Sequence, residues 1–396
     1  MVLRDKILLF VLVVGGVLGL SWHWVEGRSE LKVMGVGGQE ILFASQLSDN
    51  ETAVMAMEKD GKGLIQVTEA SNRMGMNYFK IVDGLLAIGV PLHYIPEFMM
   101  RQFHGVYQDG PVWSPDGSQF AFAAGRQYRF YWSVKKKIEL DVYVAEGDGS
   151  DVRRLTEGIG DVRGQMIWSP DGSALLVEGE ADLYLIDVMT GRNEILLAGM
   201  AVNDEPTWSP DGKRIVVAMS RGYSAELYLV EVESGEIEQL SWVEERVLGY
   251  RTPTWSPDGS QLAVRFCDWE RCQVQVLGVD EAGVPMVGDE EQVWLFEFSL
   301  FLTPLTWSPD GHQIVLRGQK EGVEGLYVID VVNDGVQLVV EDRRIDGGLS
   351  WRPDGKEILF TSYGDGDGEI FVVGPDGSGL QQLTFNEVKD WGPVWR

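Results

Sequence analysis

The sequence predicts an all-β protein, a seven-bladed β-propeller of four-stranded antiparallel blades preceded by one N-terminal membrane helix. Three observations support this prediction: a turn motif that recurs along the chain, short alternating segments after each copy, and an apolar run near the start. The composition is that of a globular chain, with 44% hydrophobic and 24% charged residues. Its 48 glycines indicate many turns.

The recurring motif is Trp-Ser-Pro-Asp-Gly, with spacings of 55, 40, 47, 52 and 44 residues between copies. Its Trp and Asp residues are Trp113 and Asp116, Trp168 and Asp171, Trp208 and Asp211, Trp255 and Asp258, Trp307 and Asp310, and Trp351 and Asp354, the last copy having Arg352 in place of Ser. Ser, Pro and Gly at these positions are typical of a type I turn. We therefore interpret these Trp and Asp residues as structural, not catalytic.

Each repeat contains four short strands. In the repeat at Trp208, residues 206–208 precede the turn, and Lys213–Met219 follow it. Residues 226–232 alternate apolar and polar side chains, and residues 236–240 follow a Glu-Ser-Gly turn. Four antiparallel strands every 40–55 residues are typical of propeller blades.

The last repeat begins at the C-terminus and continues near the N-terminus. Residues 392–396 match the start of a repeat, and residues 39–45 match the second strand of the repeat at Trp351. Joining both ends in one blade closes a ring and leaves no exposed sheet edge. We therefore expect Val394 and Trp395 to pair beside residues 41–44.

These observations divide the chain into an N-terminal segment, a linker and a propeller. The predicted boundaries are a membrane segment or signal peptide at 1–25, a linker at 26–38, and a propeller at 39–396, with a composite first blade (392–396 and 39–70), an insert at 71–110, and further blades that start near 111, 166, 206, 253, 305 and 349.

The six motif copies, together with the pattern Glu-Ile-Phe-Val-Val…Pro-Asp-Gly-Ser-Gly-Leu-Gln-Gln-Leu-Thr of residues 369–384, resemble the TolB-like β-propeller repeat family. The resemblance covers residues 39–70 and about 111–396. It implies a propeller fold but not TolB itself, because the TolB pattern has a separate N-terminal α/β domain and six blades. The family repeat also occurs in prolyl-oligopeptidase-type enzymes, which carry a hydrolase domain in addition.

The N-terminus has the pattern of an export signal. Arg4 and Lys6 precede an apolar run that extends from Ile7 to Val25, about 28 Å long as a helix. That length nearly matches the hydrocarbon core of a bilayer, and Trp22 and Trp24 lie at the far end. An uncleaved signal-anchor and a cleaved signal peptide both remain open. Either one predicts that the propeller lies on the extracytoplasmic side of the cell membrane.

Charge and residue content exclude several functional classes. A net charge of −28 opposes nucleic-acid binding, because phosphate contacts require Lys and Arg. None of the four His residues has metal-ligand spacing relative to another, and the sequence has neither a Gly-x-Ser-x-Gly elbow nor a phosphate loop. We therefore expect no catalytic residues, no cofactor and no metal. Asp365, Asp367 and Glu369 alternate with glycines as a calcium loop would, but we favour a hairpin turn.

The two cysteines, Cys267 and Cys272, lie at the end of one predicted strand and the start of the next. Opposed positions in a hairpin bring their Cβ atoms close to disulfide distance, and export favours oxidation. A disulfide is therefore the favoured state, and two free buried thiols are the alternative.

Two segments depart from the repeat pattern. The insert 71–110 contains the apolar, Met-rich stretch 84–103, which suits short helices over one face, a contact with the membrane, or a degenerate eighth blade. The second is the hairpin around residues 125–138. Its basic and aromatic residues are Arg126, Tyr128, Arg129, Phe130, Tyr131, Trp132, Lys135, Lys136 and Lys137. On an acidic chain they form a candidate surface for an acidic partner, lipid headgroups or a glycan, with a solvated hairpin as the alternative.

The functional expectation is a membrane-tethered scaffold or accessory subunit that binds a protein partner. The alternative is a propeller-type hydrolase or lyase with its active site in the central channel. That alternative requires a cluster of acids and His residues there, and the low His content argues against it.

Overall fold

The fold is taken from a computed structural model, which describes most of the chain between residues 31 and 396. The described residues are 31–33, 39–48, 51–70, 101–130, 136–148, 151–156, 162–179, 182–198, 202–221, 224–243, 247–268, 272–287, 293–298, 300–301, 305–342, 344–364 and 366–396. They form 31 β-strands and no helix. No helix among them is long and apolar enough to cross a membrane. The predicted segment 1–25 lies outside the described residues, as do residues 71–100 of the insert.

The chain divides into two compact units. Nearly all described residues belong to the unit formed by Val33–Thr68, Gly105–Gln127 and Lys137–Arg396. Within the predicted linker, β1 (Leu31–Val33) forms a strand that pairs with β5 (Thr68–Ala70). The linker therefore includes a short stretch of sheet, which suits the branched and apolar side chains of Leu31 and Val33.

Two ends of the chain contribute to the first sheet. Its strands are β2 (Ile41–Ser48), β3 (Glu51–Met57), β4 (Ile65–Gln66), β6 (Arg101–Trp113), β7 (Gln119–Phe130), β8 (Lys136–Glu146), β9 (Arg153–Arg154) and the C-terminal β31 (Asp390–Trp395). Their order is β31-β2-β3-β6-β7-β8-β9, with β4 also paired to β3. β3 and β6 meet in a parallel pair of Glu51 with Val106. The sheet is therefore two four-stranded groups joined at one point.

The next strands along the chain repeat this arrangement. They are β10 (Arg163–Trp168), β11 (Ala174–Glu178), β12 (Leu183–Asp187), β13 (Asn193–Leu197), β14 (Val202–Trp208), β15 (Arg214–Arg221), β16 (Ser224–Glu231), β17 (Ile237–Gln239), β18 (Gly249–Trp255), β19 (Gln261–Cys267), β20 (Cys272–Gly278) and β21 (Val293–Phe298). The strands β10 to β13 form one antiparallel sheet, and β14 to β21 form two further groups joined by a single parallel pair, Ala225 with Gly249. For the repeat at Trp208, the observed strands β15 to β17 differ from the expected ones by at most two residues at each end.

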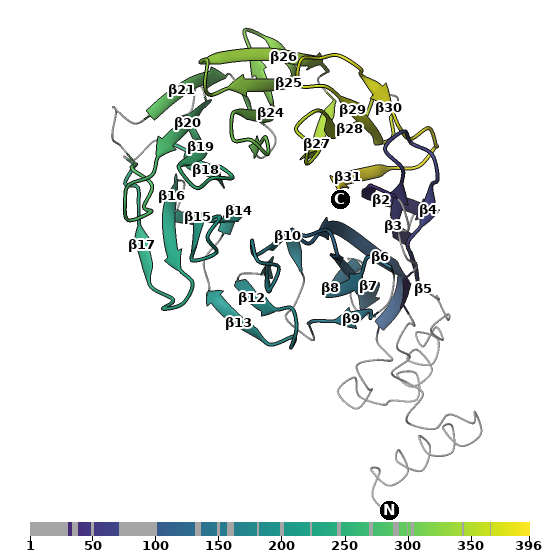
Figure 1. The fold of residues 1–396 in the computed structure, drawn as a ribbon. Coiled ribbons are helices and arrows are strands. Elements are labelled where there is room, and N and C mark those ends of the chain that lie inside the picture. The colour runs from purple at the N-terminus through teal and green to yellow at the C-terminus, as the bar shows by residue number, and fades with distance from the viewer. Residues whose placement is uncertain are drawn as a thin grey trace, which may run out of the picture. The chain divides into compact units, whose positions relative to one another are not determined.

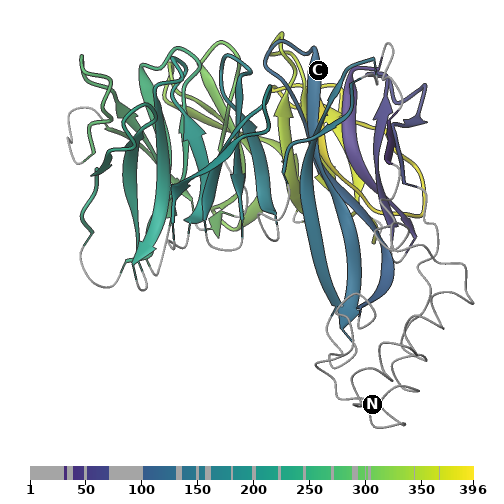
Figure 2. The ribbon, with the colours of Figure 1, turned by 90° about the horizontal axis from the view of Figure 1, so that it is seen from below.

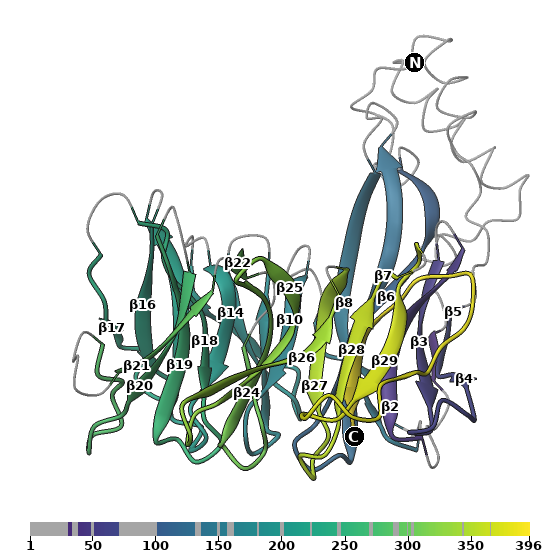
Figure 3. The same cartoon turned by 90° about the horizontal axis from the view of Figure 1, so that it is seen from above.

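Two more antiparallel sheets complete the described chain. They contain β22 (Leu300–Phe301), β23 (Thr306–Trp307), β24 (Gln313–Lys320), β25 (Val323–Asp330) and β26 (Gly335–Glu341), and then β27 (Ile345–Trp351), β28 (Ile358–Ser362), β29 (Glu369–Val373) and β30 (Gln381–Gln382). In the larger compact unit the sheets follow one another around a common centre, from purple through teal and green to yellow (Figure 1). Side views show their strands running between the two faces of this unit (Figures 2 and 3). The all-β prediction is confirmed for the described residues.

The C-terminal strand closes the first sheet. In the pairing of β31 with β2, Trp395 lies opposite Ile41 and Val394 lies opposite Leu42. Gln46 N–H donates to the Lys389 carbonyl at 2.8 Å, and Arg396 N–H donates to the Glu40 carbonyl at 2.8 Å. The predicted pairing of the two chain ends is confirmed, and β2 therefore has a partner on both sides.

The motif tryptophans after the half-buried Trp113 are buried between neighbouring sheets. Trp168, Trp307 and Trp351 are each 7% exposed. Their indole N–H groups donate to the carbonyls of Val112, Thr254 and Thr306, at 3.0–3.2 Å. Each of these carbonyls belongs to the residue just before the tryptophan of the preceding repeat, so in these three copies the tryptophan joins one repeat to the one before it.

The hydrophobic core lies between the sheets and not in one central cluster. One cluster packs Trp395, Ile41 and Phe43 against Leu359 and Ile370 of the adjacent sheet. Burial of such side chains contributes on the order of 1.5–3 kcal/mol each. The stability of each sheet therefore depends on the sheets beside it.

We predict that Trp395→Ala strongly destabilises the protein. The substitution removes a buried ring from the closing strand, which costs about 3–5 kcal/mol for a core tryptophan. The matched control is Trp242→Ala, because the Trp242 side chain is 77% exposed. Thermal unfolding of both variants is the measurement. Equal melting temperatures for the two variants would show that the closing strand contributes little to the ring.

Candidate functional site

The Asp residues of the repeated motif serve their own turns. In the first copy, Asp116 Oδ1 accepts from Ser114 Oγ at 2.7 Å and from Ser118 N–H at 3.0 Å. Gly117 N–H closes the turn on the Ser114 carbonyl at 2.8 Å, with φ of +68° at Gly117. Hydrogen bonds lower the pKa of Asp116 to about 2. The largest contribution comes from the Ser114 hydroxyl, and smaller ones come from the N–H and hydroxyl of Ser118.

The other motif copies have the same local geometry. Asp171, Asp211, Asp258 and Asp310 each accept from the hydroxyl of the Ser two residues earlier, at 2.6–2.7 Å. In each case this hydroxyl is the first cause of a lowered carboxyl pKa. In the sixth copy, where Arg352 replaces Ser, Asp354 accepts from Lys356 N–H at 3.1 Å. The hydroxyl and N–H donors of the turn thus favour the ionised form of these carboxylates, which makes them poorly suited to proton transfer.

A cavity of about 260 Å³ lies among the first strands of several repeats. Its lining residues are Ile167, Pro206, Thr207, Thr252, Pro253, Thr254, Leu305, Thr306, Gly348 and Leu349. No titratable side chain is among them. Its described lining therefore offers hydroxyl and backbone groups together with apolar surfaces.

Thr252 in this cavity has an unusual backbone. The residue three positions before the motif tryptophan has a positive φ in four repeats: +59° at Gly110, +46° at Thr252, +63° at Gly348 and +61° at Gly392. The pairing of β18 with β19 shifts register between Arg251 and Thr254, which marks a β-bulge. Glycine tolerates this conformation, whereas a β-branched residue is strained in it. Thr252 is 6% exposed, and no hydrogen-bond partner of its Oγ1 atom is present.

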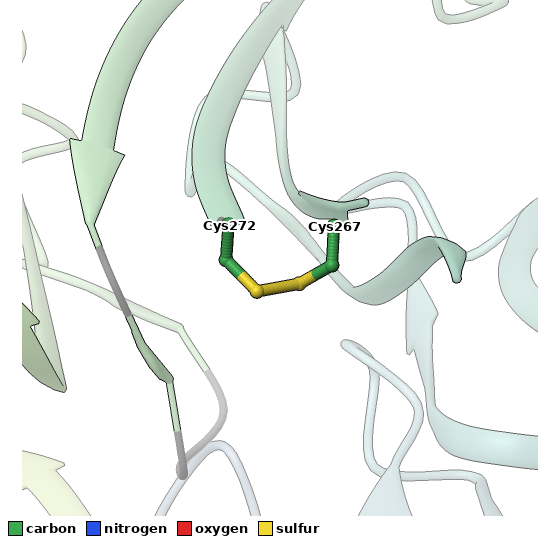
Figure 4. The surroundings of a disulfide bond; sticks show 2 residues. All are labelled: Cys267 and Cys272. Carbon is green, nitrogen blue, oxygen red and sulfur yellow. A yellow bond between two sulfur atoms is a disulfide. The ribbon is translucent and has the colours of Figure 1, made fainter. Parts of the chain in front are cut away.

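A disulfide joins Cys267 at the end of β19 to Cys272 at the start of β20 (Figure 4). The two sulfur atoms are 1.99 Å apart and the two Cα atoms 4.1 Å apart. The residues lie directly opposite each other in the register of the two strands. The bridge therefore closes the outer end of a hairpin, and neither cysteine is a free thiol.

Two predicted features lie wholly or partly outside the described residues. The side chains from Arg126 to Lys137, which form the candidate basic and aromatic surface, are not described, although β7 and β8 include several of these residues. Asp365 of the considered calcium loop also lies outside them. Among the residues that are described, no three His, Cys, Asp or Glu side chains are grouped to hold a metal ion.

Sequence reasoning missed a polar brace that recurs between the third and fourth strands of a repeat. Ser241 Oγ donates to Glu226 Oε2 at 2.5 Å and accepts from Leu227 N–H at 2.9 Å. Thr384 Oγ1 makes the same two contacts with Glu369 and with Ile370 N–H. A third copy joins Thr156 to Asp141 at 3.2 Å and to Val142 N–H at 2.9 Å. The signal was available, because an acid recurs 15 residues before a Ser or Thr in each case.

The brace at Glu369 lies beside a second buried acid, Asp390 of the closing strand. Glu369 is 1% exposed and Asp390 is fully buried. Asn386 ties them together, because its N–H donates to Glu369 Oε1 at 3.2 Å and its side-chain amide donates to Asp390 Oδ2 at 2.7 Å. Burial raises the pKa of both carboxyls, which is opposite to the shift at the turn aspartates. The closing strand thus begins at an electrostatically unfavourable site.

Comparison with known proteins agrees with this architecture. The profile of the TolB beta propeller domain matches residues 166–292 and 297–396. The uncharacterized peptidase YuxL of Bacillus subtilis is 31% identical over 136 residues, which are 33% of this chain and 18% of that protein. The chain thus spans only a small part of the length of this curated relative.

Two solved structures share the fold. TolB from Acinetobacter baumannii superposes with a TM-score of 0.51 at 15% identity, covering 90% of this chain and 82% of that one. A puromycin-hydrolyzing peptidase of Mycobacterium tuberculosis superposes with a TM-score of 0.52 at 16% identity, covering 71% of this chain and 46% of that one. At such identities the likeness concerns the fold alone.

We predict that Thr252→Gly stabilises the protein. Glycine adopts the positive φ freely, and an L-residue in this region costs roughly 1–2 kcal/mol, partly offset by the greater flexibility of glycine in the unfolded chain. Thermal unfolding measures the effect. Thr207→Gly, which alters a neighbouring cavity residue without a positive φ, is expected to destabilise. A lower melting temperature for Thr252→Gly would show that the threonine is not strained.

We predict that Asp390→Asn raises the melting temperature at pH 8 but not at pH 3. Because burial raises the folded-state pKa of Asp390, the folded protein binds this proton more tightly than the unfolded chain. Stability is therefore lost as pH rises from the unfolded-state value, about 3.9, through the raised folded-state value. Asparagine removes the charge and keeps an acceptor for Asn386.

Asp376→Asn is the control for this measurement, because hydrogen bonds from Ser378 lower the pKa of that carboxyl. It is expected to leave the melting temperature at pH 8 unchanged or lower it. A gain at pH 8 in both variants would mean that relief of overall negative charge, and not burial of Asp390, is the cause.

Proposed function

The chain belongs to the TolB β-propeller domain family, and on this premise we propose that it is an extracytoplasmic, membrane-tethered propeller that acts as a protein-interaction scaffold or accessory subunit. The observation that carries the proposal is the chemistry of the central cavity. Among the residues that the structure describes, its lining consists of Thr, Pro, Gly, Ile and Leu and contains no acid, base or nucleophile pair for hydrolysis or lyase chemistry. A rigid ring with many loops at its rim is suited to recognition.

We further propose that the propeller has seven blades. The strand groups that support this count are β31 with β2–β4, β6–β9, β10–β13, β14–β17, β18–β21, β22–β26 and β27–β30. In this count β31 supplies the inner strand of the blade that β2 to β4 continue. The blade boundaries then follow the motif spacing of the sequence.

The membrane tether is proposed from the sequence alone. Residues 1–25 contain the basic start and the apolar run that suit a signal-anchor. With Arg4 and Lys6 retained in the cytoplasm, the propeller lies on the other side of the membrane. An oxidised Cys267–Cys272 pair is compatible with such a compartment.

The proposed partner surface is the basic and aromatic hairpin of Arg126–Lys137. It places five cationic residues on a chain with a net charge of −28. Aromatic residues beside them would add contact area at low entropic cost. An acidic protein surface is the partner that suits this composition.

We predict that changing Arg126, Arg129, Lys135, Lys136 and Lys137 to Ser weakens capture of membrane partners and leaves folding intact. Exposed substitutions usually change stability by less than about 0.5 kcal/mol. The measurement is affinity capture from solubilised membranes with the full chain, at increasing salt. Wild-type capture is expected to fall with salt, because the contacts are ionic.

The control replaces five exposed cations elsewhere with Ser: Lys59, Lys62, Arg192, Lys213 and Lys356. It makes the same change in net charge and is expected to retain partner capture. If both variants recover the partners that the wild type recovers, the hairpin is a solvated loop and the scaffold must bind through another surface.

A further inference from the structure

A hollow of about 360 Å³ lies where two neighbouring repeats meet, away from the central cavity. It is lined by Arg317, Arg344, Ile345 and Tyr363. Arg317 belongs to β24, Arg344 and Ile345 lie at the start of β27, and Tyr363 directly follows β28. Two guanidinium groups and one phenol thus share a hollow on a chain with a net charge of −28.

The backbone around Arg344 is held on both sides. Its N–H donates to Asp342 Oδ1 at 2.9 Å, and its carbonyl accepts from Tyr363 N–H at 3.1 Å. The other oxygen of Asp342 accepts from Ser362 Oγ at 2.5 Å. These bonds connect the start of β27 to the end of β28. The backbone of Arg344 is therefore held in place without a ligand.

Glycines leave room for the polar groups of the hollow. A Cβ at Gly364 would lie 3.8 Å from Arg344 Nη2, so this end of the guanidinium lies over a residue without a side chain. A Cβ at Gly368 would lie 3.2 Å from the Cε1 and Cζ atoms of Tyr363, so the phenol ring rests against that glycine. Gly368 therefore leaves space that the Tyr363 ring occupies, whereas a Cβ at Gly364 would make only ordinary contacts.

Carboxylates hold both arginines at ion-pair distance. Arg344 Nε is 3.7 Å from Asp342 Oδ1, and Arg317 Nη2 is 3.8 Å from Glu324 Oε2. The distance at Arg344 exceeds the length of a charge-assisted hydrogen bond, about 2.7–2.9 Å. The Arg317 side chain is only 12% exposed, whereas that of Arg344 is 55% exposed. Arg344 is thus accessible to a ligand, and Arg317 supplies a second charge that is largely buried.

We propose that this hollow binds a carboxylate group of a ligand, with Arg344 as the main donor and Arg317 and Tyr363 as supporting groups. A planar carboxylate matches the two parallel N–H donors of a guanidinium. Because Glu324 and Asp342 already balance the two arginines, a monoanion fits this site better than a phosphate dianion. The proposal is independent of the scaffold role and of the hairpin proposed above.

The test is a saturation-transfer NMR titration of the full chain with acetate, observed at its methyl signal. We expect saturable binding to the wild type and about ten-fold weaker binding to Arg344→Gln, because a hydrogen bond to a charged group is lost. Arg344→Lys keeps the positive charge but lacks the two parallel N–H donors of a guanidinium, so it is expected to restore only part of the affinity. Acetamide, the neutral isostere of acetate, is expected neither to saturate nor to compete.

The matched protein control is Arg192→Gln, an exposed arginine in a turn of another repeat, which is expected to bind acetate as the wild type does. Equal melting temperatures of the Arg344 variants and the wild type establish that folding is unchanged. Equal acetate affinity for Arg344→Gln and the wild type, or no saturable acetate signal in the wild type, would overturn the site. Displacement of acetate by inorganic phosphate at lower concentration than acetate itself would overturn the carboxylate assignment.

Discussion

Pairing between the C-terminal strand β31 and the early strand β2 is the constraint on which the rest of this structure depends. Without it, β2 would expose a row of unpaired backbone groups, and the hydrophobic cluster around Trp395 would lose one wall. Arg396 extends the closure, because its guanidinium lies 4.8 Å from the ring of Trp113 and its Nε donates to the Gly117 carbonyl at 3.1 Å. Sequence positions 279 residues apart thus meet at one turn. Since each sheet packs mainly on its neighbours, this one junction supports the whole ring.

The central cavity and the junctions between repeats differ in the side chains that line them. First-strand residues of several repeats line the central cavity, and the described lining residues carry no charge. Charged side chains also meet at a junction between neighbouring repeats. The hollow of Arg317 and Arg344 is an example, because neither repeat could form it alone. Recognition at such junctions therefore depends on how adjacent repeats differ.

Two populations of carboxylate have opposite electrostatic consequences. The turn aspartates are stabilised in the charged form by hydroxyl and backbone donors, and their pKa values are lowered. Glu369 and Asp390 are buried near one another, and their pKa values are raised by desolvation. The polar brace of Thr384 limits this cost at Glu369 because its hydroxyl donates to the carboxyl. Ionised carboxylates thus cost little where they are solvated or accept hydrogen bonds. Their ionisation is unfavourable where they are buried at the closing strand.

The sequence alone predicted the elements that depend on short-range interactions. The motif turns form from hydrogen bonds within five residues, as between Ser114, Asp116 and Gln119, so their geometry is inherent in the motif. The pairing of β31 with β2 was also predictable, because two incomplete repeats at the chain ends complement each other. What the tertiary structure decided depends on contacts between repeats. The meeting of Arg317 with Arg344, the burial of Asp390 beside Glu369, and the bulge that places Thr252 in the central cavity have no local sequence signal. Each arises because side chains from separate repeats pack together, and a repeat pattern records what the repeats share but not how each one fits its neighbours.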